Sequence, residues 1–165
     1  FWPGQMFAYD TVQIIIQGDT IIEQKKYKKL VDANGILDKV IRSEGSKFYG
    51  RNHELYNGFS HEYMFLDTQL PVGGSWSYEK SEGLKKTEYI VKARYSELKI
   101  DGKVYTDVIE IAVNYYDKVG EEFEYWFTVN HCYANHVGEI YNFDPKSPIF
   151  FYGGSLSTSL IRYQQ

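Results

Sequence analysis

The feature that most constrains the fold is an alternation of apolar and polar residues through the second half of the chain. Three successive runs between residues 87 and 129 follow it, separated by Asp101-Gly102 and Val119-Gly120. Successive side chains of a strand point to opposite faces, so a period of two predicts strands with one apolar face, joined by tight turns. The predicted apolar faces are Thr87, Tyr89, Val91, Ala93 and Tyr95, then Tyr105, Ile109, Ile111, Val113 and Tyr115, and then Phe123, Tyr125, Phe127 and Val129.

The first half follows the same pattern less regularly. Residues 7–16 predict a strand that Gly18-Asp19 would turn. The apolar spacing of residues 21–41 fits a helix or a strand, but Asn34-Gly35 between two such runs is a strong hairpin signal, so we predict strands. Asn57-Gly58 predicts another hairpin turn. The remaining predicted strands are 47–56, 60–66, 137–143 and 156–163.

A stretch near the middle of the chain, residues 66–78, joins the two halves. Pro71 fixes its own φ, and Gly73-Gly74 permits backbone angles that a side chain would forbid. Trp76 and Tyr78 follow with period two and share one face. We therefore predict a strand end, a turn and a strand start, with Trp76 and Tyr78 either filling one end of the core or forming a platform for a ligand.

These observations predict an all-β, antiparallel fold with two related β-meanders that form a curved half-barrel or a β-sandwich. With 165 residues, the chain is expected to be a single domain. A weak internal repeat, approximately 1–65 and 66–165, supports the two meanders. At one constant offset, residues 22–27 align with 100–105, Phe48-Tyr49 with Trp126-Phe127, Asn52-His53 with Asn130-His131, and Tyr63 with Tyr141.

Aromatic residues are unusually frequent, with 16 Tyr and 10 Phe. Tyr suits both the wet edges of a core and recognition surfaces. Core filling is the simpler interpretation, because Leu and Ala are scarce and the rings would fill the space between curved strands. The alternative is a concave aromatic surface that binds a glycan or an apolar chain. Its candidate ligand-binding residues are Trp76, Tyr78, Tyr89, Tyr105 and Trp126.

Charge and cysteine content narrow the possible partners. The net charge of −4 gives no basic footprint for nucleic acid. No apolar run approaches the roughly 20 residues needed to span a membrane, so no membrane-spanning segment is expected. Cys132 is the only cysteine, which rules out a disulfide within the chain.

His131, Cys132 and His136 form one cluster of residue types that bind metals. Zinc takes His nitrogen and Cys sulfur, but three ligands at this spacing match no standard zinc pattern. His131 and Cys132 would also point to opposite faces of a strand. We regard them as weak candidates for a metal site or a Cys–His nucleophilic pair, and predict no metal, no cofactor and no catalytic residue. Walker, dinucleotide-binding, Gly-x-Ser-x-Gly and His-Glu-x-x-His motifs are all absent.

The order of several short motifs resembles a group of exported, lipoprotein-type β proteins from Bacteroidetes. The motifs are residues 70–78 (Leu-Pro-Val-Gly-Gly-Ser-Trp-Ser-Tyr), residues 100–109 (Ile-Asp-Gly-Lys-Val-Tyr-Thr-Asp-Val-Ile) and residues 160–163 (Leu-Ile-Arg-Tyr). The resemblance covers residues 66–165 best. Two departures are His136-Val137-Gly138, where the group has Gly-Val-Gly, and the lack of the lipidated cysteine that would precede such a domain.

This resemblance implies an all-β fold, export, and a place in the periplasm or at the cell surface, with lipid anchoring through a segment that this chain lacks. It supplies no activity and no site residue. The leading hypothesis is a non-enzymatic binding or scaffolding protein of the cell envelope, whose partner is a glycan, a lipid or an envelope protein. The alternatives are a hydrolase or metal-dependent enzyme that uses His131, Cys132 and His136, and a protein–protein interaction module that pairs through an exposed strand edge.

Overall fold

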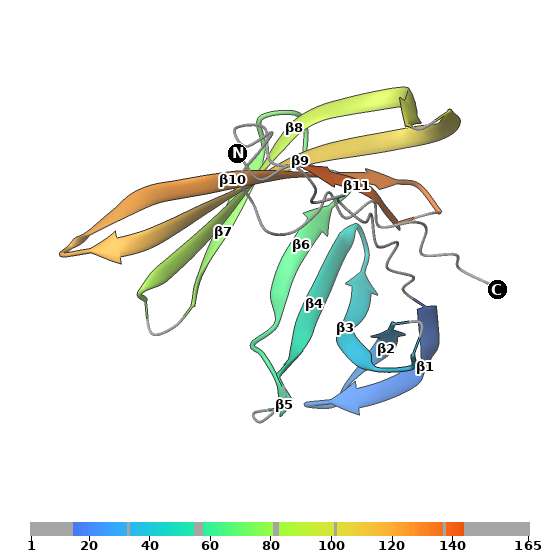
Figure 1. The fold of residues 1–165 in the computed structure, drawn as a ribbon, viewed down its shortest axis with the longest axis horizontal. Coiled ribbons are helices and arrows are strands. Elements are labelled where there is room, and N and C mark those ends of the chain that lie inside the picture. Colours follow the sequence, from blue (N-terminus) through green and yellow to red (C-terminus); the bar gives the residue numbers. More distant parts are fainter. Residues whose placement is uncertain are drawn as a thin grey trace, which may run out of the picture.

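A computed structural model describes residues 15–143, except for residues 33, 55–57, 81–82, 101 and 137. The described residues form strands and turns without any helix. They build two antiparallel meander sheets, each curled into a half-barrel (Figure 1). The prediction of an all-β antiparallel fold with two curved meanders is confirmed. The predicted strand at 156–163 and most of that at 7–16 lie outside the described residues.

The first sheet contains the strands of the first half of the chain. Its order is β1-β2-β3-β4, and β5 and β6 both pair with β4. β5 pairs with His53 and Glu54, whereas β6 pairs with Lys47 to Gly50, so together they occupy the second edge of β4. The strands are β1 (Ile15–Ile22), β2 (Lys25–Val31), β3 (Leu37–Glu44), β4 (Lys47–Glu54), β5 (Gly58–Phe59) and β6 (Tyr63–Asp67).

The second sheet follows in strand order β11-β10-β9-β8-β7. Its central strands are much longer than those of the first sheet. As a result, the β8–β9 and β9–β10 hairpins extend to opposite sides of the molecule (Figure 1). The strands are β7 (Ser75–Lys80), β8 (Lys85–Ile100), β9 (Lys103–Val119), β10 (Glu122–Ala134) and β11 (Gly138–Phe143).

The stretch between β6 and β7 carries the chain from one sheet to the other, as predicted. Gly74 donates its backbone N–H to the Pro71 carbonyl at 2.9 Å, which closes a turn. Gly73 has a φ of 86°, which a side chain would disfavour. The Gly73 N–H then bonds to the Val91 carbonyl at 2.8 Å, so this turn is fixed to β8 before β7 begins.

The prediction of a first turn at Gly18-Asp19 is wrong. Gly18 and Asp19 do not turn the chain but lie inside β1, where the register against β2 shifts between Ile16 and Asp19. The turn comes at Glu23 and Gln24, whose φ values of 51° and 65° are those of a two-residue hairpin turn. The strand interpretation of residues 21–41 is confirmed, because β2 and β3 form a hairpin around Asn34-Gly35.

Bulges in the second sheet break the predicted single faces. The β8–β9 register shifts between Val91 and Ala93, so Tyr95 does not share a face with Tyr89. The β9–β10 register shifts between Tyr125 and Phe127, which places these two rings on opposite faces. A bulge inserts one unpaired residue and reverses the alternation beyond it. The expected faces over 87–95 and 123–129 are therefore wrong in part.

The main core lies between the two sheets. Leu66 of β6 packs there with Tyr89, Val91, Ile109, Ile111 and Val113 of β8 and β9. A second cluster contains Val108, Cys132, Ala134 and Ile140, with Tyr95 and Tyr105 packed against it. The strand order gives no support to the repeat. Its anchors align β2 with β9 and β4 with β10, yet β3 lies between β2 and β4 whereas β9 and β10 are neighbours.

The inside of the first curl holds a charged network. Arg42 of β3 donates to both carboxylate oxygens of Glu62 at 2.7 Å, and the Tyr27 hydroxyl of β2 bonds to the same carboxylate. Arg51 of β4 pairs with Glu23 from the β1–β2 turn. Because Glu62 immediately precedes β6, these contacts cross several strands of the sheet. The network therefore links β2 and β3 to the residue that precedes β6.

No membrane-spanning helix is found among the residues that the structure describes. The prediction of a single domain over residues 1–165 includes both ends of the chain, which lie outside the described part, and it stays a prediction.

Candidate ligand cavity between the two sheets

A cavity of about 1200 Å³ lies between the two sheets. One wall comes from β2, β3, β4 and β6, and the opposite wall comes from β8, β9, β10 and β11. Among the described residues, the two sheets pack closely where β4 and β6 meet β7, β8, β9 and β10, and the cavity opens beside this contact. The fold thus creates an internal surface to which both sheets contribute.

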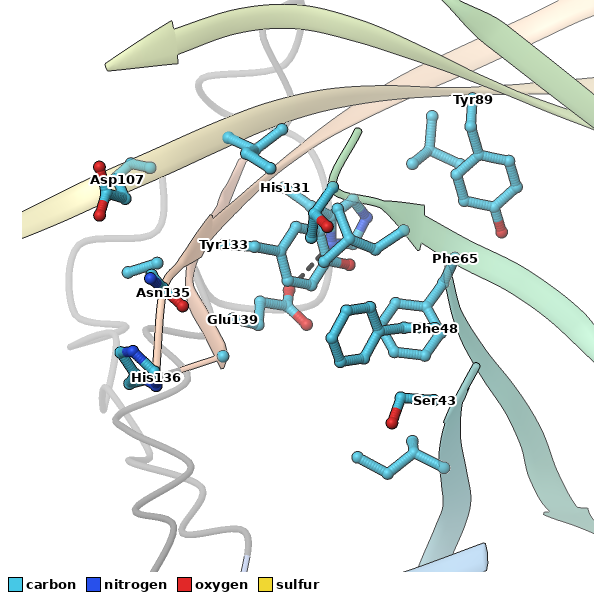
Figure 2. Close-up of a pocket in the computed structure, with 18 of the residues that line it drawn as sticks. Ser43, Phe48, Phe65, Tyr89, Asp107, His131, Tyr133, Asn135, His136 and Glu139 are labelled. Carbon is cyan, nitrogen blue, oxygen red and sulfur yellow. Dashed lines mark hydrogen bonds and ion pairs between the residues drawn. The ribbon is translucent and has the colours of Figure 1, made fainter. Parts of the chain in front are cut away.

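The cavity walls are mainly apolar. Phe48 and Phe65 approach from the first sheet with ring centroids 6.3 Å apart, and Phe65 meets Tyr133 of β10 at 6.0 Å (Figure 2). Tyr63 contacts Phe65 edge-on at 6.5 Å. Burial raises the pKa of Tyr63 and Tyr133, which keeps both phenols neutral. Further apolar lining comes from Leu30, Ile41, Leu66, Tyr89, Val108, Ile109, Val113 and Tyr115.

A partly buried polar pair lies in this mainly apolar wall. His131 Nδ1 of β10 lies 2.8 Å from Glu139 Oε1 of β11, and both side chains line the cavity (Figure 2). The imidazole stacks on the Tyr133 ring, with centroids 6.2 Å apart. A register shift between Cys132 and Tyr133 sets Glu139 opposite Tyr133 and so brings it to His131. The hydrogen bond to Glu139 and the stacking on Tyr133 thus hold the imidazole of His131 in place.

Basic side chains also line the cavity, namely Lys28, Lys39, Arg42 and Arg94. Lys28 is paired with Asp19 at 2.7 Å, and Arg42 is paired with Glu62. Arg94 donates to the backbone carbonyls of Thr68 and Leu70, which leaves its charge unneutralised by these partners. The lining carboxylates are Asp107 and Glu139, and the carboxylates of Asp19 and Glu62 already neutralise Lys28 and Arg42.

The structure brings together part of the predicted aromatic site. Trp76 stacks on Tyr89 at 5.1 Å with the planes 4° apart, and Tyr78 stacks on Tyr89 at 6.0 Å. Of these rings Tyr89 lines the cavity, while Trp76 and Tyr78 support it from the core. Tyr105 lies apart, against the second cluster. Trp126 is 60% exposed on β10, with the Lys85 ammonium 5.9 Å from its ring.

The weak metal or nucleophile candidates are not brought together. Cys132 is buried in the second cluster, on the face of β10 opposite to His131. Burial raises the pKa of the Cys132 thiol to about 11, so the nucleophilic thiolate is disfavoured. His136 lies in the β10–β11 turn with a φ of 59°. Among the described residues, no group of three or more His, Cys, Asp or Glu side chains could hold a metal ion.

Sequence reasoning missed most of the cavity lining. Phe48, Tyr63, Phe65 and Tyr133 belong to predicted strands, but nothing in their spacing shows that they face a space between two sheets. Glu139 was missed as well, because its contact with His131 depends on the register and bulge of β10 and β11. The only available signal was the aromatic excess of the whole chain.

No protein-family model, curated protein or solved structure matches this chain. The geometry of the cavity is therefore the basis for any functional conclusion.

Proposed function

We propose that this chain is a non-enzymatic binding protein that holds an apolar molecule in the cavity between its two sheets. The observation that carries the proposal is the cavity itself, with about 1200 Å³ between walls of Phe, Tyr and aliphatic side chains. Binding pockets for small molecules are usually concave and mostly apolar, with a few placed polar groups. The His131–Glu139 pair provides such a polar group.

The composition of the walls favours an apolar ligand over a glycan. Phe48, Phe65 and Tyr115 are partly exposed there and offer no hydrogen bond, or a single phenol, to the hydroxyl groups that cover a sugar, whereas Leu30, Val108 and Val113 are almost fully buried. Transferring apolar surface out of water yields roughly 25 cal/mol per Å², so an acyl chain or fused ring system gains most from this lining. The most exposed ring among the described residues, Trp126, lies outside the cavity lining.

The enzymatic alternative has less support from the geometry. Cys132 faces away from His131, and its thiol has a raised pKa. A cysteine nucleophile requires an activated thiolate beside a base. A binding function accounts for the His131–Glu139 pair without requiring a nucleophile.

The binding test uses a neutral naphthylamine dye whose fluorescence rises in apolar surroundings. Ser43 of β3 lines the cavity, so Ser43→Trp adds a large ring to the cavity lining. Ser77 of β7 is also an exposed strand serine but does not line the cavity, which makes Ser77→Trp the matched control. We expect saturable dye binding to the wild type and to Ser77→Trp, and at least about tenfold weaker binding to Ser43→Trp. Equal binding to all three proteins would contradict the proposal.

We also propose that the protein acts in the cell envelope, as the motif order of residues 70–78, 100–109 and 160–163 implies. Fractionation of the native host with an antibody against this chain tests the location. Recovery with periplasmic or membrane fractions is expected, and recovery with cytosolic enzymes would contradict it.

A further inference from the structure

The His131–Glu139 contact determines which ring nitrogen of His131 carries the hydrogen. An ionised carboxylate only accepts hydrogen bonds, so the 2.8 Å contact requires His131 Nδ1 to carry the hydrogen. In the neutral imidazole, Nε2 is then an acceptor. Stacking on Tyr133 holds the ring plane, so this lone pair has a set direction.

His131 Nε2 has no hydrogen-bond partner within the described part of the chain. The side chain is only 20% exposed, and it lines the cavity. A ligand that fills the cavity would displace water from this nitrogen, so a partner that enters with the ligand is favoured. Its complement is a hydrogen-bond donor.

We propose that the ligand is a neutral apolar alcohol whose hydroxyl donates a hydrogen bond to Nε2 of His131. This inference rests on the proposed function and names its ligand class. The apolar body lies against Phe48, Phe65 and the aliphatic wall, and the hydroxyl is its single polar end.

The charges around the cavity select a neutral end group. A ligand carboxylate at His131 would approach the carboxylate of Glu139, which bonds to the same imidazole. A ligand ammonium would enter a cavity lined by Arg94, whose backbone carbonyl partners do not neutralise its charge. Like charges close together in a poorly solvated site are unfavourable. A hydroxyl donates a hydrogen bond without either conflict.

The test compares four ligands of equal chain length: a long-chain alcohol and the matching alkane, fatty acid and amine. Each displaces the naphthylamine dye from the wild type, from His131→Phe and from His53→Phe. Phe keeps a ring to stack on Tyr133 but lacks the acceptor nitrogen. His53 is an exposed histidine of β4 that does not line the cavity, so it supplies the control.

We expect the alcohol to bind the wild type and His53→Phe about tenfold more tightly than the alkane, as one well-placed hydrogen bond allows. In His131→Phe this preference should vanish while alkane binding stays. Because His131→Phe leaves Glu139 without this imidazole partner, the double variant His131→Phe/Glu139→Gln is measured as well. It should show the same loss of preference with a neutral residue in place of the carboxylate.

The outcomes separate this inference from the proposed function. If the alcohol and alkane bind the wild type equally, or the acid or amine binds most tightly, the hydroxyl assignment is wrong while the binding function stands. If His131→Phe keeps the alcohol preference, His131 is not the acceptor. If none of the four ligands displaces the dye, both the inference and the proposed function fail.

Discussion

The indole Nε1 of Trp76 donates a hydrogen bond to the backbone carbonyl of Met64 at 2.8 Å. Trp76 lies on the first strand of the second sheet and Met64 on the last strand of the first sheet, so this bond connects the two sheets directly. The same ring stacks on Tyr89, which lines the cavity. Trp76 therefore helps to fix the separation of the walls between which a ligand would lie.

Replacing Trp76 should destabilise the protein much more than replacing Trp126. Trp76→Phe removes the indole donor and leaves the Met64 carbonyl without this partner, at an expected cost of roughly 1–3 kcal/mol. Trp126→Phe changes an exposed ring and should stay within about 0.5 kcal/mol. Urea unfolding of both variants tests this. Equal losses would show that the Trp76–Met64 bond does not hold the sheets together.

The core between the sheets should be sensitive to lost volume. Ile111 is fully buried beside Val91 and Tyr89, so Ile111→Ala should lower the free energy of unfolding by roughly 2–5 kcal/mol. Ile21 is 73% exposed on β1, and Ile21→Ala should cost less than about 0.5 kcal/mol. Denaturant titrations of Ile111→Ala and Ile21→Ala measure both losses in the free energy of unfolding. A small loss for Ile111→Ala would contradict the assignment of the main core to this contact.

Glu62 should make stability depend on acid pH. Hydrogen bonding to Arg42 lowers the pKa of Glu62 from 4.5 to about 2. A lowered carboxyl pKa stabilises the fold above the unfolded value, and this contribution is lost as the pH falls from 4.5 towards 2. Glu62→Gln should therefore cost about 1–3 kcal/mol at neutral pH, and the difference from wild type should shrink across that range.

Glu44→Gln serves as the matched control for Glu62. Glu44 bonds to the same Arg42 but its side chain is 71% exposed, so its loss should be small at every pH. Thermal unfolding measured from neutral pH down to about pH 2 tests both variants. A difference for Glu62→Gln that stays constant with pH would contradict the role of the ionised carboxylate.

Cys132 should be inert in the folded protein. Burial raises the pKa of its thiol from 9.0 to about 11, which lowers the thiolate fraction at pH 8 by about a hundredfold. A disulfide reagent should therefore react with the native protein far more slowly than with the urea-unfolded chain. Equal rates would mean that the β10 face bearing Cys132 is open to solvent.

The alternation of residues was sufficient to predict the class of the fold and most of the strands. It failed where a bulge changed the register, as between Val91 and Ala93 or between Tyr125 and Phe127, because a bulge depends on the pairing of two strands. Gly18-Asp19 was predicted to be a turn because the sequence alone does not show that this pair belongs to a register shift between β1 and β2. In β1 the positive φ of Gly18 serves a register shift instead.

The candidate site was harder to predict than the fold. Tyr89 was named as a candidate from the aromatic excess of the whole chain, and Trp126 and Tyr105 could not be distinguished from it on that ground. His131 was named as a candidate together with Cys132 and His136, with which it forms no site in the structure. Its actual partner, Glu139, is reached through the β10–β11 hairpin and a bulge, which alternation alone does not specify.

The most direct test of the central claim is calorimetric titration of the long-chain alcohol at several temperatures. The account predicts saturable binding at one site with a negative heat-capacity change, because apolar surface is buried on binding. Ser43→Trp should weaken this binding at least about tenfold and Ser77→Trp should preserve it. Absence of saturable binding to the wild type, or unchanged binding to Ser43→Trp, would contradict the claim that the cavity between the two sheets holds an apolar ligand.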